Sequence, residues 1–321
     1  MMPDDEASST EADTLHASSS TDAHTLRDWL AREPYTLVLS SSFFGFYAHI
    51  GVLAALLEAG LPPSAVAGSS AGALVTALWA AGMEPQQMYS CFDEAVKERG
   101  SLRPAVPWRE PGGVLSAAHI VRRLKGIIEE LGLATRLERC RVPSSVSVFD
   151  LRRLSARALH EGPLAEAVAA SMAVPAMFAP VYLDGRPHLD GGLGDMPGVL
   201  GVPPQARILY HHATIWPQSL TPLHAGAPEG RRPTLWRPSQ PRAPATAHTS
   251  SPLPGLAAGA YEASVTLQIL DLPMLHPLRL EPGLGAFQAA KQATAEALAR
   301  PLGARPEGGS GWQRLTMRAK L

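Results

Sequence analysis

Residues 68–72 read Gly-Ser-Ser-Ala-Gly, which places Ser70 between two glycines at the spacing of a nucleophile elbow. In such an elbow the serine sits on a strained turn between a strand and a helix, and Gly68 and Gly72 leave room for close backbone approach. The bland alternative is a structural Gly/Ser turn, which is common in α/β proteins. Because a serine hydroxyl is a weak nucleophile, the motif predicts chemistry only if a base lies nearby.

The strongest candidate for that base is Asp190, which begins the tight turn Asp190-Gly191-Gly192. An aspartate before glycine is more often a simple turn former, and its ordinary pKa of about 3.9 makes it a poor base for a hydroxyl. Burial near Ser70 would have to raise its basicity. His211 and His212 follow Asp190 in the chain and could complete a conventional triad, although nothing local positions them.

The elements around Ser70 can be predicted from periodicity. The apolar run 35–40 is typical of a buried strand, and helical spacing runs from Phe46 to Gly60. A very short strand at 64–67 and an Ala-rich helix ending at Gly82 repeat this arrangement around the motif. The sequence also predicts helices at 25–33 and 163–173, a strand at 142–151 and a hairpin at 181–192 that turns at Asp184-Gly185. This alternation indicates an α/β fold with a largely parallel sheet between helices.

The expected domain organisation is simple. Residues 1–24 are acidic and rich in Ser and Thr, lack the features of a secretory signal, and are expected to form a disordered tail. Residues 25–300 are expected to form the domain, which contains a proline-dense loop or insertion at 217–256 and C-terminal helices over 257–300. Residues 301–321 are expected to be frayed.

Composition excludes several classes of protein. The 28 basic and 29 acidic residues nearly cancel, so no overall field favours nucleic acid or an anionic surface. The two cysteines, Cys91 and Cys140, are too few for a disulfide framework, which favours a reducing, cytoplasmic compartment. No apolar run reaches the roughly 18 to 20 residues of a spanning helix. Membrane contact, if there is any, is therefore expected to be peripheral.

Four blocks of the sequence resemble the patatin-like phospholipase family in order and spacing: residues 37–61, 66–78, 146–151 and 166–192. The resemblance covers roughly Tyr35 to Pro197. It implies a three-layer α/β/α sandwich with a mainly parallel central sheet. It also implies a Ser-Asp dyad without histidine, in which Ser70 is the nucleophile and Asp190 the base. Such a dyad would hydrolyse lipid acyl esters, as a phospholipase A, lysophospholipase or esterase does, through an acyl-enzyme and without a cofactor or metal.

The sequence departs from the family in one loop. Members usually carry G-G-G-x-(Arg/Lys)-G, whose backbone N–H groups form the oxyanion hole. The aligned positions are here Ser41, Ser42, Phe43, Phe44, Gly45 and Phe46. Every residue but proline has an N–H, so serine and phenylalanine can still serve as donors. We expect the N–H groups of Ser41, Ser42, Phe43 and Gly45 to form the hole, with Gly45 adopting any left-handed kink and the two serine hydroxyls as additional donors.

The aromatic side chains of this loop have two interpretations. Phe43, Phe44, Phe46 and Tyr47 either pack in the core or form an apolar wall for an acyl chain. His49 matches a position that is often histidine in the family, and we expect a structural role for it. The altered loop also leaves an alternative to catalysis, a catalytically impaired protein that keeps the fold as a lipid-binding or interaction module.

Overall fold

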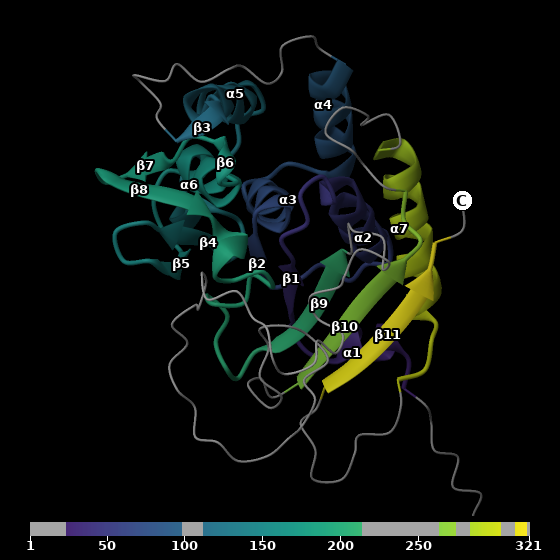
Figure 1. The fold of residues 1–321 in the computed structure, drawn as a ribbon. Coiled ribbons are helices and arrows are strands. Elements are labelled where there is room, and N and C mark those ends of the chain that lie inside the picture. The colour runs from purple at the N-terminus through teal and green to yellow at the C-terminus, as the bar shows by residue number, and fades with distance from the viewer. Residues whose placement is uncertain (1–23, 98–111, 214–262, 274–282, 303–311, 320–321) are drawn as a thin grey trace, which may run out of the picture.

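The computed structural model describes residues 24–97, 112–213, 263–273, 283–302 and 312–319 (Figure 1). Most of the predicted N-terminal tail and the whole proline-dense segment 217–256 lie outside the described residues. The chain begins with α1 (Leu26–Arg32), β1 (Thr36–Leu39), α2 (Phe46–Glu58), β2 (Ala65–Ser69) and α3 (Ala71–Ala80). These five elements confirm the prediction from periodicity.

The middle of the chain contains three helices, six strands and two short 3-10 helices among the described residues. They are α4 (Pro85–Lys97), β3 (Gly113–Leu115), α5 (Ala117–Glu130), η1 (Leu137–Arg139), β4 (Ser144–Asp150), β5 (Ser155–Leu159), α6 (Leu164–Ser171), β6 (Ala176–Phe178), β7 (Val181–Leu183), β8 (Arg186–Asp190) and η2 (Gly191–Leu193). The predicted strand 142–151, helix 163–173 and hairpin are confirmed as β4, α6 and β7–β8. The hairpin turns at Asp184 and Gly185, which both have positive φ, as a type I′ turn requires.

The last described elements are β9 (Arg207–Ala213), β10 (Ala263–Leu270), α7 (Gly283–Leu298) and β11 (Trp312–Arg318). Two expectations were wrong here, because β10 lies in a region predicted to be helical and β11 in the predicted frayed tail. The strand β10 pairs with β9 on one side and β11 on the other. Val265, Leu267 and Ile269 of β10 alternate with polar residues, which is the period of a strand, and the helical prediction over 257–300 overlooked it.

The central sheet has nine strands, with the order β11-β10-β9-β1-β2-β4-β8-β7 and with β5 paired to β4. The six strands from β11 to β4 are parallel, whereas β5 and β8 run antiparallel to β4 and β7 antiparallel to β8. The fold is therefore an α/β sandwich with a mainly parallel sheet. A separate two-stranded sheet joins β3 and β6.

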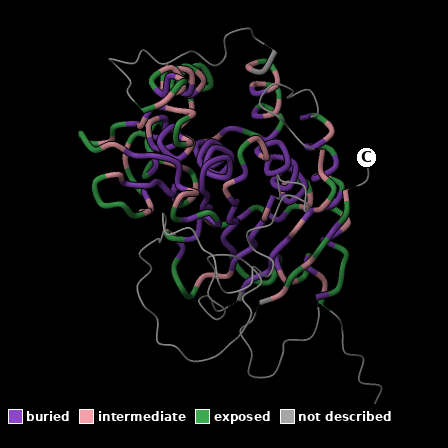
Figure 2. The backbone as a smooth tube through the Cα atoms, viewed as in Figure 1, coloured by how far each residue is buried: buried purple, intermediate pink, exposed green. Residues whose placement is uncertain are grey.

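The two faces of the sheet differ in their cover. One large core cluster joins side chains of all the described helices to the face that carries Leu37, Leu39 and Val146, and buried residues concentrate around α2, α3 and the central strands (Figure 2). On the opposite face, Val38 and Tyr210 belong to a smaller cluster with residues of the segment 195–206. The described residues of this cluster that lie outside the sheet all belong to that segment.

The helices α2 and α7 lie side by side and touch through their backbones (Figure 1). A Cβ atom at Gly51 of α2 would lie 2.3 Å from the carbonyl oxygen of Phe287 in α7. Only a residue without a side chain allows this approach, so Gly51 sets the spacing of the two helices. Since α2 follows directly from the loop 41–45, that spacing also bears on the loop's position.

We therefore predict opposite effects from two glycine-to-alanine changes in helices. Gly51→Ala forces the clash with Phe287 and should destabilise the protein by about 1 to 3 kcal/mol. Gly126→Ala, in the exposed part of α5 where a new Cβ meets nothing within 4 Å, should stabilise it by about 0.5 to 1 kcal/mol through helix propensity. Urea unfolding of both variants measures this, and equal effects would contradict the close packing.

Candidate active site

The strand β4 brings Ser70 and Asp190 together. Ser69 at the end of β2 is in register with Ser147 of β4, and the next residue of β4, Val148, is in register with Asp190 at the end of β8. The residue after Ser69 therefore meets the carboxylate that ends β8. A parallel and an antiparallel pairing on the same strand thus join two residues that are far apart in the sequence.

Ser70 and Asp190, the two residues predicted as nucleophile and base, are hydrogen-bonded. The Ser70 hydroxyl donates to Oδ2 of Asp190 at 2.6 Å, and the N–H of Gly192 donates to Oδ1 at 2.8 Å. Ser70 has φ 53° and ψ −120°, a strained conformation for a residue with a side chain. Gly72 permits the turn, because a Cβ there would lie 2.0 Å from the carbonyl oxygen of Leu39. The backbone thus has the strained strand-to-helix turn of a nucleophile elbow.

Burial changes the chemistry of the carboxyl group. Asp190 is 5% exposed, and desolvation raises the pKa of its carboxyl from 3.8 to about 6, against the lowering effect of the hydrogen bonds from Ser70 and Gly192. A carboxylate with this pKa is ionised at neutral pH and is a stronger base than an exposed aspartate. The arrangement can therefore accept a proton from the hydroxyl that touches it.

The loop 41–45 lies beside this pair. A Cβ on Gly192 would lie 2.6 Å from Oγ of Ser41, so the Ser41 side chain rests against the turn that contains Asp190. The carbonyl oxygens of Leu39 and Ser40, which precede the loop, border Gly72 in the first turn of α3. The loop is therefore held between the elbow and the Asp190 turn.

The four N–H groups expected to form the oxyanion hole are not equivalent. The Ser41 N–H donates to the carbonyl oxygen of Met196 at 2.8 Å, and the Gly45 N–H donates to that of Ser42 at 2.7 Å. Among the described residues, the N–H groups of Ser42 and Phe43 have no acceptor. These two adjacent amides remain as donors for an incoming group.

The expected role of Gly45 as the hinge of the loop was wrong. Gly45 has φ −69°, whereas the positive φ of the loop, 45°, falls on Phe43. Glycine is needed at position 45 for space instead, since a Cβ there would lie 2.6 Å from Oγ of Ser42. A left-handed conformation costs a residue such as phenylalanine about 1 to 2 kcal/mol, so neighbouring contacts must hold Phe43 in place.

The aromatic side chains of the loop and of the start of α2 differ in burial, and the histidines lie away from Ser70. Tyr47 is fully buried and Phe46 nearly so, as the core-packing interpretation predicts, whereas Phe43 is 41% exposed and Phe44 is partly buried. The histidines considered for a triad do not contact Ser70. His211 bonds to His49 and His212 to Tyr210.

Two polar residues near the site, Ser171 and Asp195, were not predicted. Ser171 of α6 accepts the Ser70 N–H at 2.8 Å and donates to the carbonyl oxygen of Ser147 at 2.6 Å, so it fixes the strained turn to β4. Asp195 is buried and accepts hydrogen bonds from the Ser147 hydroxyl and from the N–H groups of residues 198, 199 and 200. The contacts of Ser171 with Ser70 and Ser147, and of Ser147 with Asp195, join segments distant in the sequence, and no local pattern signals them.

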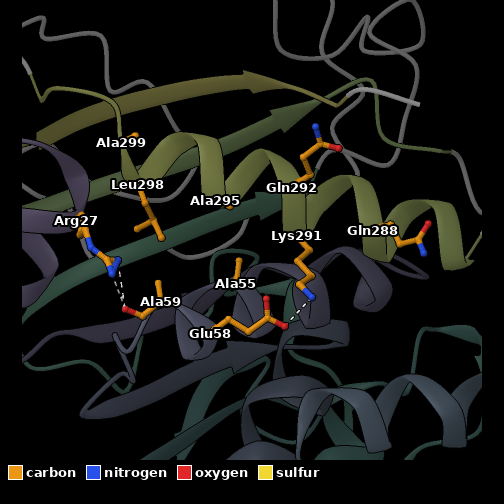
Figure 3. Close-up of a pocket in the computed structure, with 10 residues that line it drawn as sticks. All are labelled: Arg27, Ala55, Glu58, Ala59, Gln288, Lys291, Gln292, Ala295, Leu298 and Ala299. Carbon is orange, nitrogen blue, oxygen red and sulfur yellow. Dashed lines mark hydrogen bonds and ion pairs between the residues drawn. The ribbon is translucent and has the colours of Figure 1, made fainter.

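A cavity of about 560 Å³ lies elsewhere, between the C-terminal end of α2 and α7 (Figure 3). Arg27 donates to the carbonyl oxygen of Ala59 at its edge, and Lys291 pairs with Glu58 at 2.6 Å. The loop 41–45 precedes the other end of α2, about 20 Å away at 1.5 Å of rise per residue. This cavity is therefore not part of the site around Ser70.

Comparison with known proteins gives the family. The family model described as patatin-like phospholipase matches residues 37–202, about half of the chain, and the chain belongs to this family. An uncharacterized NTE family protein of Mycobacterium tuberculosis is 33% identical over 159 residues, which are 50% of this chain and 42% of that protein. The lysophospholipase nte1 of Emericella nidulans is 29% identical over 175 residues, 54% of this chain and 11% of that protein. The match thus spans less than half the length of either relative.

Two solved structures are similar to this chain at low TM-score. VipD from Legionella pneumophila is 14% identical with a TM-score of 0.36, over 58% of this chain and 51% of that chain. ExoU, in its complex with SpcU from Pseudomonas aeruginosa, is 15% identical with a TM-score of 0.33, over 83% of this chain and 51% of that chain. No helix among the described residues is long and apolar enough to cross a membrane.

The raised pKa of Asp190 has a consequence for stability. The folded state holds the proton of this carboxyl more tightly than the unfolded state, so stability falls as the pH rises from about 3.8 to about 6 and stays lower above that. Asp190→Asn removes the buried charge and should raise the free energy of unfolding at pH 8 by up to about 3 kcal/mol. At pH 4 the difference should largely vanish.

The matched comparison is Asp195→Asn. Its carboxylate accepts hydrogen bonds from four donors, and an amide loses acceptor capacity at one end, so this change should destabilise the protein by about 1 to 3 kcal/mol. Denaturant unfolding at pH 4 and pH 8 measures both variants. Destabilisation by Asp190→Asn at pH 8 would mean that burial of the charge costs less than its hydrogen bonds contribute.

Proposed function

We propose that this chain is a serine acyl hydrolase that cleaves lipid acyl esters through a Ser70–Asp190 dyad. The observation that carries the proposal is the 2.6 Å hydrogen bond from the Ser70 hydroxyl to a buried carboxylate whose pKa is raised to about 6. Family membership supports the substrate class. The reaction belongs to the phospholipase A, lysophospholipase or esterase type.

The proposed chemistry needs only groups of the chain and water. Oγ of Ser70 attacks the ester carbonyl carbon while its proton passes to Asp190. The negative charge that develops on the carbonyl oxygen is stabilised by the N–H groups of Ser42 and Phe43. When the ester bond breaks, Asp190 returns the proton to the departing alcohol and leaves an acyl-enzyme. A water molecule, deprotonated by Asp190, then attacks the acyl carbon, and as the bond to Oγ breaks Asp190 returns this proton to Oγ, which releases the fatty acid and restores Ser70.

The side chains around the loop suit an acyl chain. Phe43 is exposed and lies next to the two donor amides, and Phe44 is partly buried beside it. Met196 is also exposed, and its carbonyl oxygen binds the Ser41 N–H. We assign these three side chains to an apolar wall for the acyl chain, because lipid sites are mostly apolar with few polar groups.

Covalent labelling tests the nucleophile and the base. A fluorophosphonate probe should label the wild-type protein, and Ser70→Ala should not be labelled. Asp190→Asn should react about 100- to 10,000-fold more slowly, because a general base contributes about that factor. Ser69→Ala is the matched control: its buried hydroxyl has no partner among the described residues, so labelling should stay at the wild-type rate.

One result would overturn the enzyme proposal. If wild type is not labelled and cleaves no short-chain acyl ester, the alternative of a lipid-binding or interaction module with this fold becomes the better account. Binding of a fluorescent fatty acid to the same preparation would then measure that activity directly.

The pH dependence of hydrolysis tests the role of Asp190 separately. Because the carboxylate must be ionised to act as the base, kcat/KM on a short-chain ester should be constant above about pH 6 and fall tenfold per unit below it. A midpoint near pH 4, the ordinary value for aspartate, would mean that burial does not tune this group. A midpoint near pH 7 that disappears in a histidine variant would assign the base elsewhere.

A further inference from the structure

The loop 41–45 is held without the glycines that its family relatives use. The Ser41 N–H is bonded to the carbonyl oxygen of Met196, and the Gly45 N–H closes a turn onto the carbonyl oxygen of Ser42 around the strained residue Phe43. The remaining contact is made by a side chain. Oγ of Ser42 lies 2.9 Å from Nε2 of His49, which stands in α2 one turn after the loop.

His49 binds the loop at two points. Its Nε2 also lies 2.9 Å from the carbonyl oxygen of Ser40, so one nitrogen joins the end of β1 to the Ser42 side chain. The ring is fully buried. Because a carbonyl oxygen can only accept a hydrogen bond, Nε2 must carry the proton and donate it, shared between Ser40 and Ser42.

A second histidine fixes the first. Nδ1 of His211, on β9, lies 2.8 Å from Nδ1 of His49, and the two rings are perpendicular. With the His49 proton on Nε2, its Nδ1 must accept a hydrogen bond from Nδ1 of His211. The backbone of His211 also accepts the Ser40 N–H at 3.2 Å, so β9 supports the start of the loop. Burial lowers the pKa of both rings, which keeps the pair neutral.

We propose that His49, held by His211, is a positioning residue that directs the Ser42 and Phe43 N–H groups toward the developing oxyanion. This inference rests on the proposed function. Among the described residues neither histidine contacts Ser70 or Asp190, so the effect passes through the loop. The pair holds a left-handed Phe43 in a conformation that glycine adopts without strain.

The test compares substitutions at three histidines. His49→Phe keeps a ring but removes both nitrogens, His49→Gln keeps an N–H donor, and His211→Phe removes the support. The matched control is His212→Phe, on the same strand, where the ring contacts Tyr210 instead. We measure kcat and KM on a short-chain ester, fluorophosphonate labelling, and hydrogen exchange of the segment 36–47, all well below the thermal midpoint of each variant.

The expected result is a loss in kcat. His49→Phe should lower kcat and the labelling rate about 100-fold with little change in KM, because a misaligned oxyanion donor acts in the transition state. His49→Gln should recover at least about tenfold of that loss, and His211→Phe should lower kcat about tenfold. His212→Phe should stay within about threefold of wild type. Exchange of the segment 36–47 should quicken in His49→Phe and not in His212→Phe.

The outcomes separate this proposal from the proposed function. Wild-type kcat in a folded His49→Phe variant would overturn the positioning role while leaving the hydrolase intact, and so would an equal loss in His212→Phe. If wild type itself neither labels nor hydrolyses, the proposed function has failed. Hydrogen exchange then still tests whether His49 holds the loop. Unchanged protection of the segment 36–47 in His49→Phe would show that it does not.

Discussion

The buried hydrogen bond between Ser70 and Asp190 is the interaction on which the arrangement of the site depends. A carboxylate removed from water is costly unless its oxygens are bound, and here one oxygen receives the Ser70 hydroxyl and the other the Gly192 N–H. The bond therefore requires the end of β2, the end of β8 and the turn after β8 to meet at one place. The register of β4 with both strands makes that meeting possible, and the hydrogen bonds of Ser171 fix the elbow to β4.

A second buried carboxylate, that of Asp195, holds the segment next to the Ser70–Asp190 pair. The Asp195 carboxylate accepts hydrogen bonds from the Ser147 hydroxyl of β4 and from the N–H groups of residues 198, 199 and 200. These bonds fix the segment 195–200 against β4. The residue next to Asp195, Met196, accepts the Ser41 N–H. One carboxylate is thus the candidate base, while a second holds the segment whose Met196 carbonyl oxygen binds the loop 41–45.

The oxyanion-binding function proposed for the loop 41–45 depends on its backbone rather than on its side chains. Oxyanion binding requires N–H groups in the right direction, and any residue except proline has one. What glycine provides is freedom to adopt the necessary conformation without strain. Where Phe43 replaces it, the strain must be met by surrounding contacts, and the structure has them in the Ser42–His49–His211 chain and in the space left by Gly45.

The sequence by itself determined the elements around Ser70, because their apolar periodicities and Gly/Pro boundaries are local, and it identified Ser70 and Asp190 through a short motif and the order of family blocks. It misread β10 as helix although Val265, Leu267 and Ile269 alternate with polar residues, and the pairing with β9 and β11 is what shows this segment to be a strand. Only the tertiary structure decided which loop amides are free, that Phe43 rather than Gly45 takes the positive φ, and that Ser171, Asp195 and His211 support the site. The physical reason is that these features arise from hydrogen bonds and contacts between residues distant in the chain, whose directions are set by strand register and helix packing.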